Sequence, residues 1–246
     1  MPNKQKHRGQ HPNDQKLFAP KFTPILQAAT SDLSWLLSKG YAEKAALKLV
    51  GDRFKLTERQ RKAIQGAACS DASQKSRQEK HCSIETLKDS HVFIDGFNLL
   101  ITIESALSGG FIFKGQDGSR RDLASVHGTY KRVSETIEAI ELVGQTLKEL
   151  KVEKATWYFD KPVSNSGRLK TLIYEVIEGK GLDWDVQLVY NPDKELIVSP
   201  SIDNIVVSAD SMVLEGAKKW FNLGAYIMDK HINLLNLIDL SCSPQT

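Results

Sequence analysis

From residue 91 onwards, short apolar segments alternate with longer amphipathic segments, and this alternation restricts the possible folds more than any other feature. Five apolar segments have the length of buried strands, at residues 91–95, 155–160, 185–190, 204–210 and 224–228. Segments with helical periodicity lie between them, at residues 99–106, 133–150, 167–179 and 211–221. Strands that alternate with helices form right-handed crossovers, which place parallel strands in one sheet with helices on both faces. We therefore expect residues 88–240 to form an α/β domain around a parallel sheet of about five strands.

The sequence before residue 85 has helical patterns instead. We expect a small all-helical module over residues 24–85, with helices at residues 31–37, at 42–50 and from Thr57 onwards. Gly51 should end the second of these helices. Thr57 is followed three residues later by Gln60, which is a capping-box pattern. Residues 70–80 either extend the third helix or form a linker, and Trp35 should lie in the core of the module.

The N-terminal residues 1–23 are polar and rich in Pro, Gly and Lys, so we expect a flexible basic tail there. The charges are distributed unevenly. Residues 1–90 hold 17 Lys and Arg against 9 Asp and Glu, whereas the rest of the chain holds 16 against 21. A basic part next to an acidic part suggests a polyanion-binding surface beside a carboxylate site, although the basic residues could also simply solvate helices.

The composition excludes several classes of protein. With 41% hydrophobic and 26% charged residues, the 246-residue chain has the composition of a globular protein. It contains no run of 18 apolar residues, so we expect no membrane span, and its basic N-terminus lacks the apolar core of a secretory signal. The three cysteines are far apart in the sequence, which argues against a disulfide framework or a structural zinc site and favours the cytoplasm.

Aspartates stand at or just beyond the ends of the expected strands: Asp95, Asp160, Asp193, Asp210 and Asp229. Any one of them could simply cap a helix or begin a turn. Several carboxylates at one edge of a parallel sheet, however, would repel one another unless a cation neutralised them. Oxygen ligands without His or Cys suit Mg²⁺ or Mn²⁺. We therefore expect Asp95, Asp160, Asp193 and Asp210 to bind such a cation and to act in catalysis.

Three motifs in this order resemble those of the PIN-like and NYN-type nuclease superfamily. They are Ile94-Asp95-Gly96-Phe97-Asn98, Tyr158-Phe159-Asp160 and Val206-Val207-Ser208-Ala209-Asp210. The whole chain also resembles the domain of unknown function 434 family, in which a small helical module precedes a PIN-like domain. The segment Asp160-Lys161-Pro162-Val163-Ser164-Asn165-Ser166-Gly167 is similar to a signature of that family.

This resemblance implies a Mg²⁺- or Mn²⁺-dependent hydrolase of the endoribonuclease type, with Asp95 as the first metal ligand and Asp210 as the last. Asp193 competes with Asp203 for one of the remaining acidic roles. The acidic residue that the superfamily carries on a helix after the first strand has no single match, because Glu135, Glu138 and Glu141 all lie there.

Several polar residues are candidates for contacts with a substrate phosphate. Asn98 could bond a metal ligand or a phosphate, or cap the following helix. Arg120 or Arg121 could grip a backbone phosphate, and His127 could donate a proton, although a surface histidine is the simpler interpretation. Ser164 and Ser166 precede a helix and could bind an anion or serve as caps. Ser208 completes this group: Asn98, Arg120, Arg121, His127, Ser164, Ser166 and Ser208.

A basic run follows the start of the third helix: Arg59, Arg61, Lys62, Lys75, Arg77 and Lys80. It could contact nucleic-acid phosphates without regard to sequence, or it could be a solvated face. Three functions therefore stay open: a metal-dependent ribonuclease, an RNA-binding adaptor of the same fold with weak or no activity, and a phosphatase of small substrates.

Overall fold

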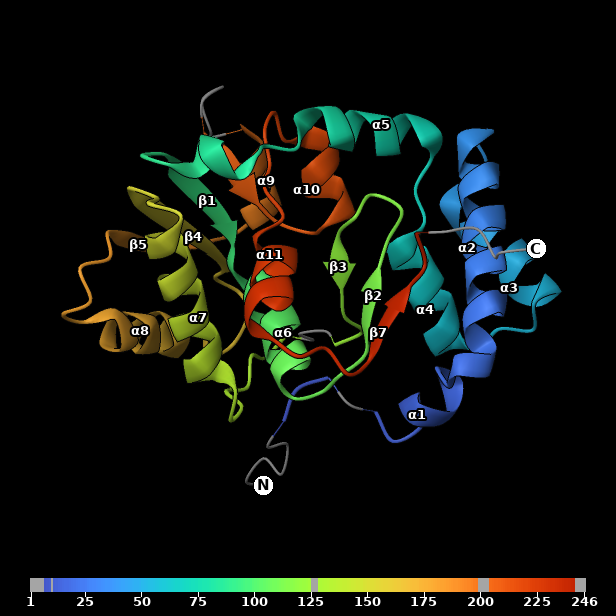
Figure 1. The fold of residues 1–246 in the computed structure, drawn as a ribbon, viewed down its shortest axis with the longest axis horizontal. Coiled ribbons are helices and arrows are strands. Elements are labelled where there is room, and N and C mark those ends of the chain that lie inside the picture. The colour runs from blue at the N-terminus through green and yellow to red at the C-terminus, as the bar shows by residue number, and fades with distance from the viewer. Residues whose placement is uncertain (1–6, 10, 125–127, 199–203, 242–246) are drawn as a thin grey trace.

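The computed structural model describes residues 7–9, 11–124, 128–198 and 204–241 (Figure 1). Its larger sheet has four parallel strands in the order β5-β4-β1-β6. These strands are β1 (His91–Asp95), β4 (Lys154–Asp160), β5 (Trp184–Val189) and β6 (Ile205–Val207). The parallel α/β architecture is thus confirmed, with one strand fewer than the five expected.

Helices cover both faces of this sheet, which explains why β1 and β4 consist of consecutive buried residues. One face packs against α6 (Gly96–Leu107), α7 (Thr136–Glu149), α8 (Ser166–Ile177) and α11 (Leu223–His231), and this core contains the fully buried Trp157 and Phe159. The other face packs against the short helices α9 (Pro192–Val198) and α10 (Ser211–Gly216), around Leu196 and Trp220.

The expected fifth strand, residues 224–228, is wrong because this segment lies within α11. The Asn222 Oδ1 accepts a hydrogen bond of 3.2 Å from the Ala225 amide and so begins the helix. Consequently Asp229 lies on a helix and not at a strand end.

A second, three-stranded sheet was not expected from the sequence. It has the order β3-β2-β7 and lies between the larger sheet and the N-terminal helices (Figure 1). Its strands are β2 (Ile112–Lys114), β3 (Arg120–Arg121) and β7 (Leu237–Asp239). The Gly/Asp-rich turn before Arg120 joins β2 to β3.

The N-terminal region contains four principal helices: α2 (Thr23–Ser38), α3 (Glu43–Arg53), α4 (Glu58–Ala67) and α5 (Asp71–Lys80). The Thr57–Gln60 capping box is confirmed at the start of α4. α3 continues through Gly51 instead of stopping there, and residues 71–80 form a helix of their own. The expectation that Trp35 is buried was wrong, because its side chain is 59% exposed while Leu33 and Leu36 turn inwards.

The expected flexible tail is ordered in its described part. Residues 14–17 form α1 (Asp14–Leu17), and a 3₁₀ turn (Pro20–Phe22) follows. Phe18 is buried, with its ring centroid 4.9 Å from that of Phe113. Apolar anchors of this kind hold a terminus in place against its conformational entropy.

One hydrophobic core joins the N-terminal helices to the smaller sheet. It combines Leu26, Leu33 and Ile64 of the helices with Phe111, Phe113, Ile238 and Leu240 from the β2 and β7 segments. The helical module expected over residues 24–85 therefore shares its core with later parts of the chain. Among the described residues, no helix combines the length and the apolar character needed to cross a membrane.

Candidate active site at the carboxyl edge of the sheet

Four aspartates lie at one edge of the four-stranded sheet. Asp95 and Asp160 are the last residues of β1 and β4, Asp193 is in the first turn of α9 after β5, and Asp210 caps α10 after β6. Because the strands are parallel, their carboxyl ends meet at the same edge. The sheet thus brings the four predicted carboxylates to one side of the molecule.

The charges of these carboxylates influence one another. Burial raises the pKa of Asp95 to about 7, and the nearby Asp193 and Asp210 charges add to that increase. Burial also raises the pKa of Asp193, with further contributions from Asp210 and Asp160. For Asp160, burial again raises the pKa.

Among the described residues, the hydrogen-bond donors to the Asp95 carboxylate are neutral. Asp95 is 8% exposed; its Oδ2 accepts a hydrogen bond of 2.8 Å from the Ser208 hydroxyl, and its Oδ1 accepts one of 3.4 Å from the Asn98 amide. Within the described part of the chain, no Lys, Arg or His forms an ion pair with Asp95, Asp160, Asp193 or Asp210. A buried carboxylate without a cationic partner is unfavourable, and a bound cation would relieve that cost.

Ser208 links the two aspartates that the resemblance places first and last among the ligands. Its Oγ donates to Asp95 and accepts a hydrogen bond of 3.0 Å from the Asp210 amide. Asp210 also has a structural role, because its Oδ1 accepts hydrogen bonds from the Met212 and Val213 amides at the start of α10. Ser208 is buried, so it positions these aspartates and does not face a substrate.

Asn98 connects α6 to the loop after β6. Its Oδ1 accepts a hydrogen bond of 2.9 Å from the Ala209 amide. The alternative that Asn98 caps α6 was wrong, because the cap is Asp95. Asn98 therefore holds the Asp210 loop against the end of β1.

The aspartates fit a divalent cation only if the protein supplies few of its ligands. Among the described residues, no group of three or more His, Cys, Asp or Glu side chains lies close enough together to enclose a metal ion. Mg²⁺ is usually held by one or two carboxylates, with waters and substrate oxygens as its remaining ligands. Asp95 and Asp210, joined through Ser208, match that smaller donor set.

The two predicted phosphate-binding arginines are held by acidic residues. Arg120 pairs with Asp229 of α11. Arg121 donates to both Asp117 carboxylate oxygens, at 3.0 and 2.7 Å, and its Nε donates to the Ala209 carbonyl at 2.7 Å. Arg121 thus supports the Asp210 loop, and each guanidinium group is already paired with a carboxylate that would compete with a phosphate for it.

The two serines before α8 do not line the cleft described below. α8 begins at Ser166, after Asn165 in a left-handed conformation, and the Ser166 hydroxyl is 3.4 Å from the Lys161 carbonyl. Ser164 contributes backbone hydrogen bonds to Gly128 and Tyr130. His127 and Asp203 lie outside the described residues.

Two of the three glutamates that were candidates for the helical acidic residue have partners elsewhere. Glu135 bonds His7 at 2.6 Å, and Glu141 pairs with Lys180 at 2.8 Å. A glutamate that sequence reasoning missed, Glu104 on α6, is fully buried and pairs with Arg8 at 2.8 Å. Burial raises the pKa of Glu104, and Arg8 opposes that increase.

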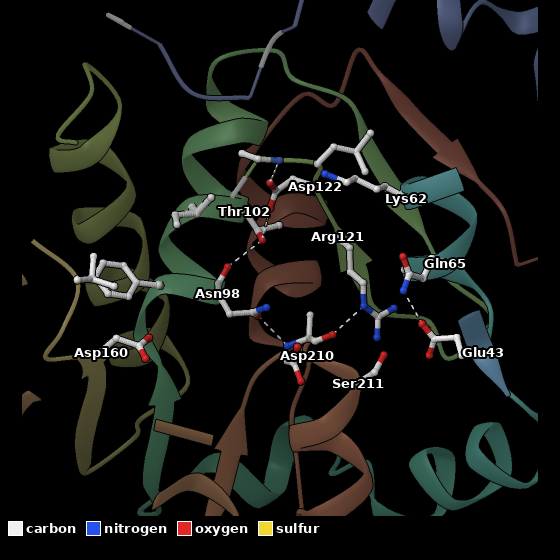
Figure 2. Close-up of a pocket in the computed structure, with 17 residues that line it drawn as sticks. Glu43, Lys62, Gln65, Asn98, Thr102, Arg121, Asp122, Asp160, Asp210 and Ser211 are labelled. Atoms are coloured by element: carbon white, nitrogen blue, oxygen red, sulfur yellow. Dashed lines mark hydrogen bonds between the residues drawn. The ribbon is translucent and has the colours of Figure 1, made fainter. Parts of the chain in front are cut away.

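An open cleft of about 660 Å³ begins at the aspartate edge and extends to the N-terminal helices (Figure 2). Asn98, Asp160 and Asp210 lie on its sheet side, whereas Lys62 and Gln65 come from α4. The residues that line it are Glu43, Lys62, Gln65, Gly66, Phe97, Asn98, Ile101, Thr102, Arg121, Asp122, Leu123, Ala124, Asp160, Val163, Ala209, Asp210 and Ser211. Two separate regions of the chain therefore form this one cleft.

Sequence reasoning missed a carboxyl group inside the cleft that is hydrogen-bonded to a hydroxyl. The Thr102 hydroxyl donates to Asp122 at 2.7 Å, and burial raises the pKa of Asp122. Asp122 also accepts a hydrogen bond from the Ala124 amide. The only sequence signal for it was its position directly after the two arginines.

The comparisons with known proteins follow the same division of the chain. A family model described as a domain of unknown function (DUF5616) matches residues 84–226, which is more than half of the chain. The chain belongs to this family. A second model, described as a protein of unknown function (DUF434), matches residues 25–80, so the expected resemblance of the N-terminal region is confirmed.

A relative from Methanocaldococcus jannaschii, "Uncharacterized protein MJ0935", is 31% identical over 190 residues. The alignment covers 77% of this chain and 89% of the relative. No solved structure matches the chain.

Proposed function

We propose that this member of the DUF5616 family is a metal-dependent phosphodiesterase with a PIN-like domain, and that it hydrolyses RNA. The observation that supports this most directly is the position of four carboxylates at one sheet edge, without a cationic partner among the described residues. Carboxylates in such an arrangement favour a bound positive charge, which a divalent cation would supply.

Asp95 and Asp210 would hold the cation, and Asp160 and Asp193 would add negative charge at the same sheet edge. A bound Mg²⁺ or Mn²⁺ supplies an acidified water and stabilises charge on a phosphoryl oxygen. The chain supplies the fixed geometry: Ser208 orients Asp95, while Asn98 and Arg121 hold the loop that carries Asp210. Preorganised ligands of this kind lower the cost of binding the ion.

The form of the cleft favours a strand over a small substrate. It is open to solvent and continues from the aspartates to α4, and Lys62 lies on that far side. A deep, closed pocket would instead suit a small phosphate ester. RNA rather than DNA is proposed on the resemblance to PIN-like and NYN-type nucleases.

The test is incubation of the purified protein with labelled single-stranded RNA in Mn²⁺, Mg²⁺ or EDTA, with an Asp95→Asn variant alongside. We expect cleavage that requires the divalent ion and falls by more than about 100-fold in the variant, since even indirect supports of a metal are worth 10- to 100-fold. Asp183→Asn is the matched control, because Asp183 is exposed and precedes β5 at the opposite edge. Equal cleavage in EDTA and by the Asp95 variant would rule the proposal out.

A second candidate is an RNA-binding adaptor of the same fold. It is favoured by the lack of a group of three metal-binding side chains among the described residues. RNA binding that survives in EDTA, together with no ion-dependent cleavage under any tested condition, would select the adaptor over the enzyme.

A further inference from the structure

We infer that α4 forms the second wall of the site and that Lys62 on this helix contacts the phosphate backbone of a single-stranded RNA lying across the cleft. This inference rests on the proposed function, because it specifies how the same cleft holds its substrate. It also assigns the N-terminal region a direct role in substrate binding.

The six basic residues from Arg59 to Lys80 differ in their contacts within the described part of the chain. Arg59 pairs with Asp14, Arg61 with Asp52 and Arg77 with Asp117. Lys75 lies beside Glu79, and the Lys80 ammonium donates to the Glu215 carbonyl at 2.7 Å. In the described part of the chain, no residue pairs with Lys62.

The cations that line the cleft differ in how they are held. Arg121 and Lys62 are the cations among its lining residues. Arg121 is bound on three sides by Asp117 and the Ala209 carbonyl, so it holds structure in place. Lys62 is exposed on α4 and reaches the cleft, so it is the cation there that can exchange water for a phosphate.

The residues of α4 that line the cleft lie together on one side of it. Lys62, Gln65 and Gly66 are spaced by three and four residues and therefore share one face of α4. Figure 2 shows Lys62 and Gln65 on the opposite side of the cleft from Asp160, with Asn98 and Asp210 between them. A strand carries phosphates at successive positions and can therefore contact both sides through its backbone, whereas a nucleoside monophosphate has a single phosphate.

Glu43 supplies a second, opposing charge on the same wall. Its carboxylate accepts a hydrogen bond from the Gln65 amide and lines the cleft. A phosphate backbone at this wall would be attracted by Lys62 and repelled by Glu43. The two residues therefore predict opposite effects on RNA binding.

The experiment measures the affinity of a labelled oligouridine at several salt concentrations in EDTA, where no metal-dependent cleavage can interfere. Lys62→Gln should weaken binding by roughly three- to tenfold and reduce the slope of log affinity against log salt by about 0.7, the value for one phosphate contact with a single strand. Glu43→Gln should strengthen binding by about twofold or more. Lys75→Gln, which changes a lysine outside the cleft, should change neither quantity.

The outcomes separate this inference from the proposed function. If the wild-type protein cleaves RNA but Lys62→Gln leaves both affinity and salt slope unchanged, the assignment of α4 is overturned while the activity stands. If Lys62→Gln and Lys75→Gln weaken binding equally, the attraction is diffuse and the inference also fails. A reduced slope in Lys62→Gln alone, with ion-dependent cleavage absent from the wild type, supports the wall while the hydrolase fails.

Discussion

At the scale of single residues, Ser208 has the largest influence on the geometry of the aspartate edge. Its hydroxyl donates to Asp95 at 2.8 Å and accepts from the Asp210 amide at 3.0 Å, and its side chain is buried. One hydroxyl therefore fixes a strand end and a helix start relative to each other. No other residue type of similar size both donates and accepts in this position except threonine, whose extra methyl group would need space in a packed site.

Removal of this hydroxyl gives a prediction for stability. Ser208→Ala leaves a buried carboxylate oxygen and a backbone amide without partners, so we expect the free energy of unfolding to fall by about 1–3 kcal/mol at pH 8. Urea denaturation measures this change. Ser164→Ala is the matched control, because the Ser164 side chain has no hydrogen bond with a described residue, and it should stay within about 0.5 kcal/mol of the wild type. A Ser208 variant as stable as the control would contradict the positioning role.

The positions of the aspartates could be predicted from the sequence, whereas the partners of the arginines could not. Asp95 and Asp160 follow apolar strand segments, and parallel strands bring such residues to one edge. The pairing of Arg121 with Asp117 depends on a two-residue strand and a tight turn, which leave no periodic signal. Arg120 and Arg121 point to opposite sides of β3, as neighbours on a strand must, so they could not share one phosphate.

At the scale of secondary-structure elements, a buried ion cluster fastens α5 to the rest of the molecule. Arg77 of α5 donates to Asp117 at 2.6 Å and to Glu215 of α10 at 2.7 Å, and Arg121 of β3 donates to the same Asp117. Burial alone would raise the pKa of Asp117, but Arg121 and Arg77 outweigh it and lower that pKa to about 2. Two elements, α5 and β3, thus depend on the Asp117 carboxylate remaining ionised.

This cluster predicts an acid-dependent loss of stability. The folded-state pKa of Asp117 lies below its ordinary value of 3.8, so its contribution is complete above that value and is lost as the pH falls towards 2. Asp117→Asn should lower the free energy of unfolding by about 3–5 kcal/mol at neutral pH, because it leaves the Arg121 guanidinium without a counter-charge and leaves the buried Arg77 with the partly exposed Glu215 alone. It should also flatten the dependence on pH between 4 and 2 that urea titrations detect in the wild type.

Glu215→Gln provides the comparison for this test. The Glu215 side chain is 44% exposed in its pair with Arg77, so its removal should cost about 1 kcal/mol or less. Similar losses in the two variants would mean that burial does not set the strength of the cluster.

The strands of the larger sheet were predicted correctly, whereas those of the smaller sheet were not. Three strands of the larger sheet, β1, β4 and β6, were expected because they are rich in buried residues, and β5 was expected because apolar residues alternate in it with Asp185 and Gln187. Residues 224–228 have the same appearance, yet they form a helix, because a short apolar run does not reveal its period and Asn222 provides a cap. β2, β3 and β7 have only two or three residues each, too few for alternation to be recognised.

At the scale of the whole molecule, the N-terminal segment connects regions that are distant in sequence. Phe18 packs against Phe111 and Phe113, with ring centroids 5.3 and 4.9 Å apart, and Arg8 pairs with the buried Glu104. Polar composition suggested a tail, but two well-placed anchors are enough to order such a segment. Composition alone cannot reveal them, since their partners lie about ninety residues further along the chain.

The role of this segment can be tested with one substitution. Phe18→Ala removes a buried ring from the core beneath the N-terminal helices, and we expect the free energy of unfolding to fall by about 3–5 kcal/mol. Tyr41→Ala is the control, because that ring is 55% exposed, and its effect should stay within about 0.5 kcal/mol. Thermal and chemical denaturation would detect the difference, and equal stabilities would favour the original prediction of a flexible tail.

The shared core beneath the N-terminal helices has a practical consequence for the design of expression fragments. Cloning boundaries taken from the two family matches, residues 25–80 and 84–226, would separate the helices from Phe111 and Phe113. Both fragments would also omit Phe18 and the segment that carries Ile238 and Leu240, and each would expose a hydrophobic surface to water. A gene insert that keeps this region intact begins before Phe18 and ends after Leu240.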